Sequence, residues 1–415
     1  MNPDLAQLQP YPFEKLRQLL EGITPANVSP VALSVGEPKH PAPQVVIDTL
    51  TEHLRGIEQY PSTRGIDALR ETIATWLAFR FCLKNPALLA EQHILPLNGT
   101  REGLFAIGQC LLDRSHEQRD VLMPNPFYQI YEGAALLAGC TPAFYSIDNN
   151  ADANLDSISD DAWNRCQLIY ICTPGNPTGA VLSESALQAL IERAHRHDFI
   201  IISDECYSEI YRESVGPPTG LLQAAASMGN GNFERCLVFH SLSKRSNLPG
   251  MRSGFIAGDA ALIKRFLLYR TYHGCSMSTP IQLASIAAWS DEQHVQDNRA
   301  AYDAKYSAVV ERLQAVLDIT IPPAGFYLWP KLNVDDQLFT QALFRDGHVR
   351  VVPGSFLARS VTTNASNSRS DGNPGSHHVR LALVAPIDDC LMAIDRFINC
   401  LDTHATGNTA TASST

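Results

Sequence analysis

The sequence predicts an α/β fold, with a mainly parallel sheet in a large domain and a smaller α+β domain after it. Two observations predict this fold. Between about residues 46 and 290, continuous apolar runs alternate with helix-like segments, which is typical of parallel strands buried on both faces. From about Asp291 this alternation gives way to one long amphipathic helix and several short strands. The length of 415 residues also favours two domains over one.

The elements of the large domain are expected in chain order. A strand at about residues 93–97 precedes a helix that runs from Thr100 towards Leu112. Further strands are expected in DVLMPNPFY, CQLIYICTPGNPTG, FIIISDECY and CLVFHSLSK. Helices are expected in EGAALLAG and in SESALQALIERAHRHD, which has a serine in the capping position.

The smaller domain is expected to begin with the helix DEQHVQDNRAAYDAKYSAVVERLQAVLD and to continue with short strands in GFYLWPKL, VRVVPG and VRLALVA. Residues 358–378 are rich in Ser, Asn and Gly, so we expect a mobile surface loop there. The predicted division is an N-terminal arm and small-domain segment over residues 1–45, a large domain over 46–290, a small C-terminal domain over 291–402 and a disordered tail over 403–415.

Composition excludes several classes of protein. The net charge of −11 leaves no basic stripe for a nucleic acid. No apolar run approaches the about 20 residues of a membrane span, and the N-terminus lacks the features of a secretory signal, so we expect a cytoplasmic protein without a membrane partner. The ten cysteines include no C-x-x-C pair, and no further ligands accompany His377 and His378. We therefore expect reduced thiols and no metal site.

Polar residues gather where the predicted strands end, and the carboxyl ends of parallel strands form the usual ligand site of an open sheet. The sequence contains neither of the nucleotide-binding loops, G-x-x-x-x-G-K-[ST] and G-x-G-x-x-G. A helix N-terminus, serine hydroxyls and an arginine instead suit a single phosphate monoester. The pooled residues are Asn98, Gly99, Thr100, Arg101, Tyr128, Asn176, Asp204, Tyr207, Ser241, Ser243, Lys244 and Arg252.

Lys244 is expected to have a different role from that of the phosphate ligands. A lysine beside a phosphate site, with an aspartate and a tyrosine at the end of a neighbouring strand, fits pyridoxal 5′-phosphate. The lysine amine would bond to the aldehyde carbon of the cofactor, and Asp204 would keep the ring nitrogen protonated. Tyr207 and Asn176 could hydrogen-bond the 3′ oxygen of the ring, and Tyr128 could stack on its face.

Each of these residues alone has a more ordinary explanation. Lys244 could be a solvated lysine, Asp204 could be a helix cap, and NPTG is a common turn. Cys206, next to the cofactor residues, is expected to pack rather than to react, because no base is assigned to it. The prediction therefore depends on the combination of these residues at one edge of the sheet.

The same motifs occur in the same order in a known family. GNPTG at residues 175–179, DECY at 204–207, SLSKRSNLPGMRSG at 241–254 and VRLAL at 379–383 resemble the class I/II aminotransferases. The resemblance covers the chain from about Tyr11 to Leu401. It implies the pyridoxal-phosphate-dependent transferase fold type I, in which Lys244 carries the cofactor and also moves the proton of the reaction.

The resemblance implies further roles. Arg380 would bind the substrate α-carboxylate, with a backbone contact from Gly36. Tyr60 would reach the cofactor phosphate of the partner subunit, so that the active unit is a homodimer. The insert at residues 358–378 is long for the loop before Arg380, which departs from the family pattern. The implied phosphate ligands are Thr100, Arg101, Ser241, Ser243 and Arg252.

Longer phrases resemble one group within the family, the succinyldiaminopimelate transaminases of bacterial lysine biosynthesis. They are LQPYPFEKLR, LSVGEPKHPAP, YPSTRG, LPLNGTREGLFA and PNPFYQIYEGAALLAG. The substrates implied are an amino acid, N-succinyl-LL-diaminopimelate, and a keto acid, 2-oxoglutarate, with Lys39 and Arg270 as candidates for binding the distal groups. An aspartate or alanine aminotransferase, a C–S β-lyase on the same fold and a non-enzymatic regulatory module are the alternatives. The last would need a DNA-binding segment, which the acidic chain does not show.

Overall fold

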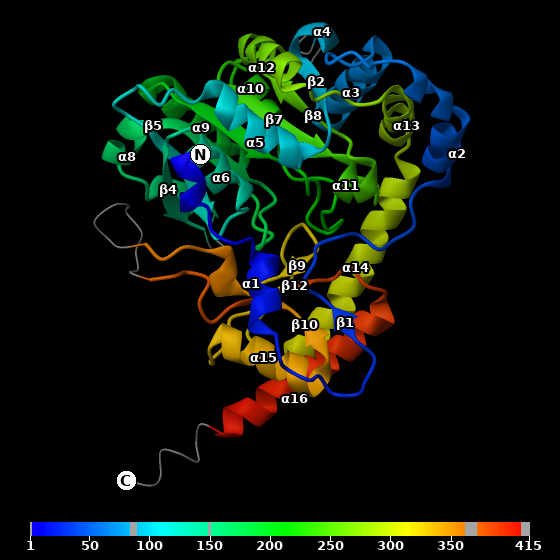
Figure 1. Cartoon of the computed structure of the whole chain (residues 1–415), viewed down its shortest axis with the longest axis vertical. Helices are drawn as coiled ribbons and strands as arrows, with labels where there is room; N and C mark the ends of the chain where they lie inside the picture. The colour runs from blue at the N-terminus through cyan, green and yellow to red at the C-terminus, as the bar shows by residue number, and fades with distance from the viewer. Residues whose placement is uncertain (1, 84–88, 148–150, 362–371, 408–415) are drawn as a thin grey trace.

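The computed structural model describes residues 2–83, 89–147, 151–361 and 372–407. A seven-stranded sheet lies in the upper half of Figure 1, with its strands in the order β2-β8-β7-β6-β5-β3-β4. The strands are β2 (Ile94–Leu97), β3 (Asp120–Asn125), β4 (Thr141–Ser146), β5 (Cys166–Cys172), β6 (Ile200–Asp204), β7 (Cys236–Ser241) and β8 (Gly254–Gly258).

The predicted mainly parallel sheet is confirmed. All neighbouring strands from β7 to β4 pair in parallel, whereas β8 runs antiparallel to both β7 and β2. A parallel pair needs a long crossover connection, usually a helix on one face of the sheet. The chain returns from β7 to β8 through only residues 242–253, which is too short for such a crossover, so β8 is antiparallel.

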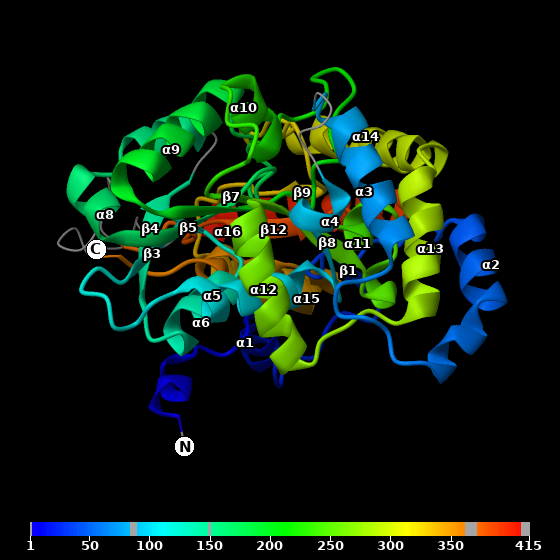
Figure 2. The ribbon, with the colours of Figure 1, turned by 90° about the horizontal axis from the view of Figure 1, so that it is seen from above.

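The sheet is buried on both faces, as its continuous apolar strands predict. Along β5, Leu168 and Tyr170 belong to the core on one face, while Ile169 and Ile171 belong to the core on the other. Figure 2 shows two layers of helices on opposite sides of the strands. One face is covered by α3 (Asp67–Arg80), α9 (Glu184–His197), α10 (Leu221–Ser227) and α13 (Thr279–Ser290), the other by α5 (Thr100–Leu111), α6 (Ile130–Leu137) and α12 (Ala260–His273).

A separate apolar core lies below the large sheet in Figure 1. It combines residues 31–33 with residues from 306–400, so the N-terminal segment packs with the C-terminal part of the chain. Strand β1 pairs in parallel with β10, and β11, β12 and β9 form an antiparallel sheet. These elements are β1 (Val31–Ala32), α14 (Gln293–Leu313), β9 (Tyr327–Leu328), α15 (Asp336–Gly347), β10 (Val349–Arg350), β11 (Val352–Pro353), β12 (Val379–Ala382) and α16 (Ile387–Gly407).

Two predicted segments differ from the structure or lie partly outside it. Helix α16 runs to Gly407, past the predicted start of a disordered tail at residue 403, and residues 408–415 lie outside the described part. The apolar face of α16 explains the extension, because Ile394 and Phe397 are buried in the small-domain core and Leu401 packs against it. The predicted loop at 358–378 is described only up to Val361 and from Gly372, which form a bridge. The predicted domain limits otherwise stay a prediction.

Shorter helices complete the fold. Helix α1 stands between the two cores in Figure 1. None of the helices in the described ranges is both long and apolar enough to cross a membrane. The remaining elements are η1 (Pro3–Gln7), α1 (Pro12–Leu19), α2 (Gln44–Glu52), η2 (Leu54–Glu58), α4 (Ala90–His93), α7 (Ala151–Asp156), α8 (Asp160–Arg165), α11 (Leu242–Arg245), η3 (Pro249–Met251) and η4 (Gly354–Leu357).

Candidate active site

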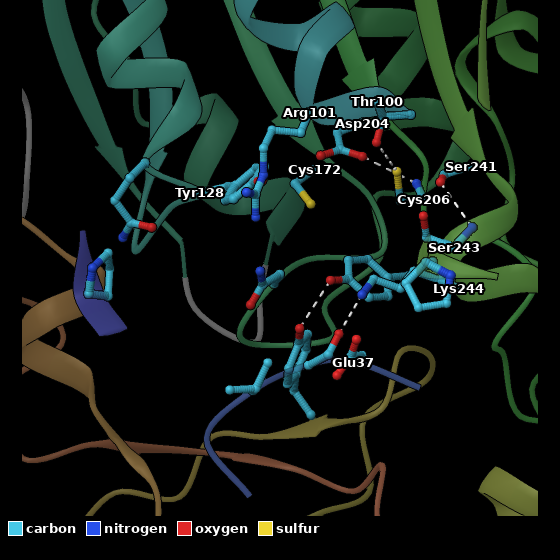
Figure 3. A pocket seen from close by; sticks show the side chains of 18 of the residues that line it. Glu37, Thr100, Arg101, Tyr128, Cys172, Asp204, Cys206, Ser241, Ser243 and Lys244 are labelled. Atoms are coloured by element: carbon cyan, nitrogen blue, oxygen red, sulfur yellow. Dashed lines mark hydrogen bonds between the residues drawn. The ribbon is translucent and has the colours of Figure 1, made fainter. Parts of the chain in front are cut away.

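A cavity of about 540 Å³ lies at the carboxyl ends of the parallel strands. Cys172, Asp204 and Ser241 are the last residues of β5, β6 and β7, and all three line this cavity (Figure 3). The N-terminal segment lines the cavity with Tyr11 and Gly36. The cavity therefore lies where the sequence predicts a ligand site, and residues distant in the chain form its walls.

One corner of the cavity has the donors expected for a phosphate. Ser241 caps the short helix α11 by accepting a hydrogen bond from the Ser243 backbone N–H at 3.1 Å. Arg252 has a left-handed backbone with φ of 53°, and its guanidinium lies against Gly99, where a side chain would collide with it. Gly99 in turn precedes Thr100, the first residue of α5, whose N-terminal N–H groups carry partial positive charge.

The amine of Lys244 reaches into the cavity from α11 and donates a hydrogen bond to the carbonyl oxygen of Gly36. Burial lowers the pKa of Lys244 to about 8, and the positive charge of Arg380 acts in the same direction. A substantial fraction of this amine is therefore neutral near physiological pH, and a neutral amine can act as a nucleophile or a base.

Asp204 is a buried carboxylate beneath the cavity. Burial raises its pKa, while hydrogen bonds from Cys206 and Tyr131 lower it. The Tyr131 hydroxyl donates to Oδ2 at 2.7 Å, and the Cys206 backbone N–H donates to Oδ1 at 3.3 Å. Within the described ranges, no Lys, Arg or His forms an ion pair with Asp204. A buried carboxylate without a cationic partner suits a ligand that brings a positive charge.

The small-domain side of the cavity presents Arg380 on β12. Its guanidinium donates to Asn176 Oδ1 at 3.0 Å and to the Ser34 carbonyl oxygen at 2.7 Å, and it stacks over the Tyr327 ring at 4.5 Å. The Tyr327 hydroxyl is 3.1 Å from that of Tyr207. Asn176 and Tyr207, both predicted to hydrogen-bond the cofactor ring, thus lie in one connected group with Arg380.

Arg101 points to another part of the cavity than the phosphate corner. It donates to the Tyr128 hydroxyl at 2.7 Å and to the Tyr11 hydroxyl at 3.4 Å. Figure 3 shows Arg101 beside Tyr128, apart from Ser241 and Ser243. Burial raises the pKa of Tyr128, so its hydroxyl stays neutral and does not cancel the charge of Arg101.

Twelve of the predicted site residues line this one cavity: Gly36, Thr100, Arg101, Tyr128, Asn176, Asp204, Tyr207, Ser241, Ser243, Lys244, Arg252 and Arg380. Five others do not: Gly99, Lys39, Tyr60, Arg270 and Asn98, whose side-chain amide donates to the Ser276 carbonyl oxygen at 3.2 Å. Gly99 touches Arg252 from behind, and Lys39 pairs with the cavity residue Glu37 at 2.8 Å. Tyr60 is fully exposed and away from the cavity, which leaves its predicted contact with a partner subunit untested.

The expectation that Arg270 binds the substrate is wrong. Arg270 was a candidate for binding the distal groups of the substrate, but it is fully buried and bonds to Glu102 and to the Cys275 carbonyl oxygen instead. It does not line the cavity.

The Glu102, His273 and Cys275 ligand atoms lie within 4.8 Å of one another, a grouping that sequence spacing does not reveal. We assign no metal there, because the Arg270 guanidinium already occupies the Glu102 carboxylate and would repel a cation.

Several cavity residues escaped the sequence analysis: Tyr11, Glu37, Cys172, Tyr131 and Tyr327. Tyr131 follows Tyr128 by three residues, a spacing that could have indicated a shared direction at a helix start. Tyr327 lies in an ordinary apolar strand, and only the pairing of β9 with β12 brings it beside Arg380.

Comparisons with known proteins agree with this geometry. The family model "Aminotransferase class I and II" matches residues 28–367. The chain belongs to the class I and II aminotransferases. An aminotransferase from Neisseria meningitidis has 44% sequence identity, covers 97% of this chain and 100% of its own, and superposes with a TM-score of 0.89. The aminotransferase AspB from Helicobacter pylori has 32% identity, coverage of 95% and 99%, and a TM-score of 0.85.

A curated relative of this aminotransferase family, named LL-diaminopimelate aminotransferase, comes from Desulforudis audaxviator. It is 28% identical over 405 residues, which are 96% of this chain and 97% of the relative. The family resemblance is therefore confirmed, and the succinylated substrate stays a proposal.

Aminotransferases of this family use pyridoxal 5′-phosphate, and the cavity fits that cofactor. The serine hydroxyls and the Arg252 guanidinium suit its phosphate, the carboxylate of Asp204 suits its protonated ring nitrogen, and the partly neutral Lys244 amine suits its aldehyde carbon. Gly99 leaves room for Arg252 at the phosphate corner, since any side chain there would displace the guanidinium.

Proposed function

We propose that this aminotransferase takes its amino group from N-succinyl-LL-diaminopimelate and passes it to 2-oxoglutarate. The observation that carries the proposal is a pair of guanidinium groups in one cavity, on Arg101 and Arg380. Among the residues that the structure describes, neither guanidinium forms an ion pair with a carboxylate. Two unpaired guanidinium groups suit a donor with carboxylates at both ends.

Arg380 is proposed to bind the α-carboxylate at the reacting end. It is nearly buried, and Asn176 and Ser34 each accept one hydrogen bond from its guanidinium. The remaining N–H groups of the guanidinium can bind a carboxylate. Arg101 is proposed to bind a distal carboxylate, since among the described residues its side chain hydrogen-bonds only to the neutral hydroxyls of Tyr128 and Tyr11. This differs from the phosphate role that the family resemblance implies for Arg101.

The charge of the cavity favours the succinylated donor over free LL-diaminopimelate. Succinylation removes the distal ammonium and adds a carboxylate, so it makes the donor more anionic. After Arg252 is assigned to the cofactor phosphate and Lys244 to its aldehyde carbon, Arg101 and Arg380 remain as cationic side chains of the cavity. Its two carboxylates are Asp204 and Glu37, and Glu37 is already paired with Lys39 at 2.8 Å. The names of the curated relatives support diaminopimelate as the substrate class.

The chain's own residues would act as follows. Bound pyridoxal 5′-phosphate supplies an aldehyde carbon that joins amino groups and a ring that accepts electrons from the substrate Cα. Asp204 holds the proton of the ring nitrogen. The Lys244 amine would accept the proton from the substrate Cα and hold it for the next proton transfer. Tyr207 and Asn176 orient the ring, and Tyr128 covers its face.

The proposed active unit is a cytoplasmic homodimer, in which Tyr60 of each subunit serves the partner's site. Tyr60 is fully exposed in the single chain, and the nearby apolar residues Leu54 and Ile57 are exposed as well. Such a run of exposed apolar side chains is typical of a surface that another subunit covers. All ten cysteines are free thiols.

A 2-oxoglutarate-dependent assay tests the substrate. The donors are N-succinyl-LL-diaminopimelate, LL-diaminopimelate, aspartate and alanine, and the readout is kcat/KM for glutamate formation. The proposal expects kcat/KM at least about tenfold higher for the succinylated donor than for each of the others. A preference for LL-diaminopimelate would contradict succinylation, and a preference for aspartate would contradict the diaminopimelate class. Release of pyruvate from cystathionine without a keto acid would indicate the β-lyase.

Arg101→Gln tests the distal site separately. Its kcat/KM should fall about 10- to 100-fold for the succinylated donor, as expected for a lost hydrogen bond between charged groups. Alanine has no second carboxylate, so its kcat/KM should change little and serves as the internal control. Equal losses with both donors would instead support a phosphate role for Arg101.

A further inference from the structure

Asp204 has a buried neighbour that the proposed mechanism does not use. Tyr131, in the first turn of α6, is fully buried. Its hydroxyl lies 2.7 Å from Asp204 Oδ2. The tyrosine donates this hydrogen bond, because burial and the Asp204 charge both raise the pKa of Tyr131 well above its usual value. The phenol therefore remains protonated over the whole working range of pH.

The Asp204 carboxylate is held at both of its oxygens. Tyr131 donates to Oδ2, and the Cys206 backbone N–H donates to Oδ1 at 3.3 Å. These two donors fix the plane of the carboxylate before any ligand arrives, and the Cys206 side chain adds a further hydrogen bond to Asp204. Such preorganisation spares a bound group the cost of turning the carboxylate into place.

Tyr131 is itself held by two other rings. It stacks on Tyr170 with ring centroids 4.6 Å apart and an interplanar angle of 9°, and it meets Tyr128 edge to face at 5.8 Å and 86°. Tyr170 lies on the neighbouring strand β5, and its own hydroxyl donates to the Leu104 carbonyl oxygen at 2.8 Å. The two stacked tyrosines are thus equally buried, but only one of them reaches Asp204.

We propose that Tyr131 is the positioning residue of Asp204: its hydroxyl orients the carboxylate and keeps it ionised for the protonated ring nitrogen of pyridoxal 5′-phosphate. The inference rests on the proposed role of Asp204. It predicts a dependence of cofactor binding on a single hydroxyl that touches neither the cofactor phosphate nor Lys244.

Titration of the apoprotein with pyridoxal 5′-phosphate, followed by fluorescence, tests the inference without an activity assay. Tyr131→Phe keeps the stacked ring but removes the donor, so the Kd should rise about 10- to 100-fold. The rise in Kd should be larger at low pH. Loss of the Tyr131 hydrogen bond raises the pKa of Asp204, and only the ionised carboxylate binds the cofactor well. Tyr170→Phe removes an equally buried hydroxyl and should leave the Kd and its pH dependence within about twofold of wild type.

A second variant covers the case in which Tyr131→Phe does not fold. Incorporation of 3-fluorotyrosine at position 131 makes the hydroxyl a stronger donor with little change of shape, and it should move the low-pH limit of cofactor binding downward. Equal effects of Tyr131→Phe and Tyr170→Phe, or a Tyr131→Phe variant with lower thermal stability but an unchanged Kd profile, would overturn the inference. An unchanged Kd in Asp204→Asn would instead contradict the role of Asp204 itself.

Discussion

The Lys244 amine donates a hydrogen bond to the carbonyl oxygen of Gly36, and this contact joins the large sheet to the N-terminal segment. Lys244 follows the end of β7, whereas Gly36 follows β1, which pairs with the small-domain strand β10. The side chain that is proposed to perform the chemistry is therefore held between the two halves of the molecule.

The protonation of Lys244 gives the first prediction. Its pKa is lowered to about 8 mainly by burial, so the apoprotein carries the neutral, reactive amine above that pH and the charged, unreactive ammonium below it. Labelling of the apoprotein with a small amine-reactive reagent, followed by peptide mass spectrometry, should give half-maximal labelling of Lys244 near pH 8. A midpoint near 10.5, the ordinary value for lysine, would contradict this account of the site.

Gly36 gives the second prediction. A methyl group at this position would overlap the Tyr327 hydroxyl, so Gly36→Ala must move either Tyr327 or the carbonyl oxygen that Lys244 contacts. We expect kcat/KM to fall about 10²-fold, the cost of a displacement of roughly 1 Å at an active site. Gly250→Ala is the matched control, because no atom lies within 4 Å of its added Cβ, and it should retain normal activity.

Arg380 gives the third prediction. Lysine keeps the charge but cannot bind a carboxylate with two parallel hydrogen bonds while it also serves Asn176 and Ser34. Arg380→Lys should lower kcat/KM about 10- to 100-fold for every amino donor, with most of the effect in KM. The exposed Arg350, on the small-domain strand β10, serves as a control, and Arg350→Lys should leave the kinetics unchanged. A donor-specific loss in Arg380→Lys would argue against binding of the common α-carboxylate.

The start of the insert at residues 358–378 gives a prediction about stability. Arg359 donates two hydrogen bonds to Glu132 at 2.8 and 2.6 Å, and both side chains are largely buried. Arg359→Ala should lower the free energy of unfolding by about 2 kcal/mol, because it leaves a partly buried carboxylate without its partner. Chemical denaturation measures this change. Arg17→Ala removes an exposed ion pair with Glu14 and should have no measurable effect.

Tyr60 gives a prediction about the assembly. A mixture of Lys244→Ala and Tyr60→Ala chains should regain about a quarter of wild-type activity after subunit exchange, since each hybrid dimer has one site with both residues intact. Neither variant alone should show this activity. If mixing restores nothing although exchange is demonstrated, Tyr60 does not serve the partner's site.

The sequence predicts the sheet and most of the cavity for a physical reason. Strands β5, β6 and β7 are continuous apolar runs, and their polar ends meet because parallel strands end at one edge. Ser241, Lys244 and Asp204 are therefore found from pattern alone. The antiparallel β8 was not predicted, because apolar pattern alone does not reveal the direction of a strand.

Contacts between distant segments account for what the sequence does not reveal. Nothing local marks Tyr131 as the donor to Asp204, since the two residues are 73 positions apart and meet only across the sheet. Arg270 carried a plausible charge for substrate binding, but its burial beside Glu102 depends on the packing of α12 on α5. Long-range packing thus decides which charged residues face the cavity.

The central claim is that Lys244 carries the cofactor in this cavity. Reduction of the holoenzyme with sodium borohydride, proteolysis and peptide mass spectrometry locate the lysine that is bonded to pyridoxal 5′-phosphate. The account predicts a phosphopyridoxyl group on Lys244 and its absence from a Lys244→Ala variant. A reduced cofactor on any other lysine of the wild-type protein would contradict the account.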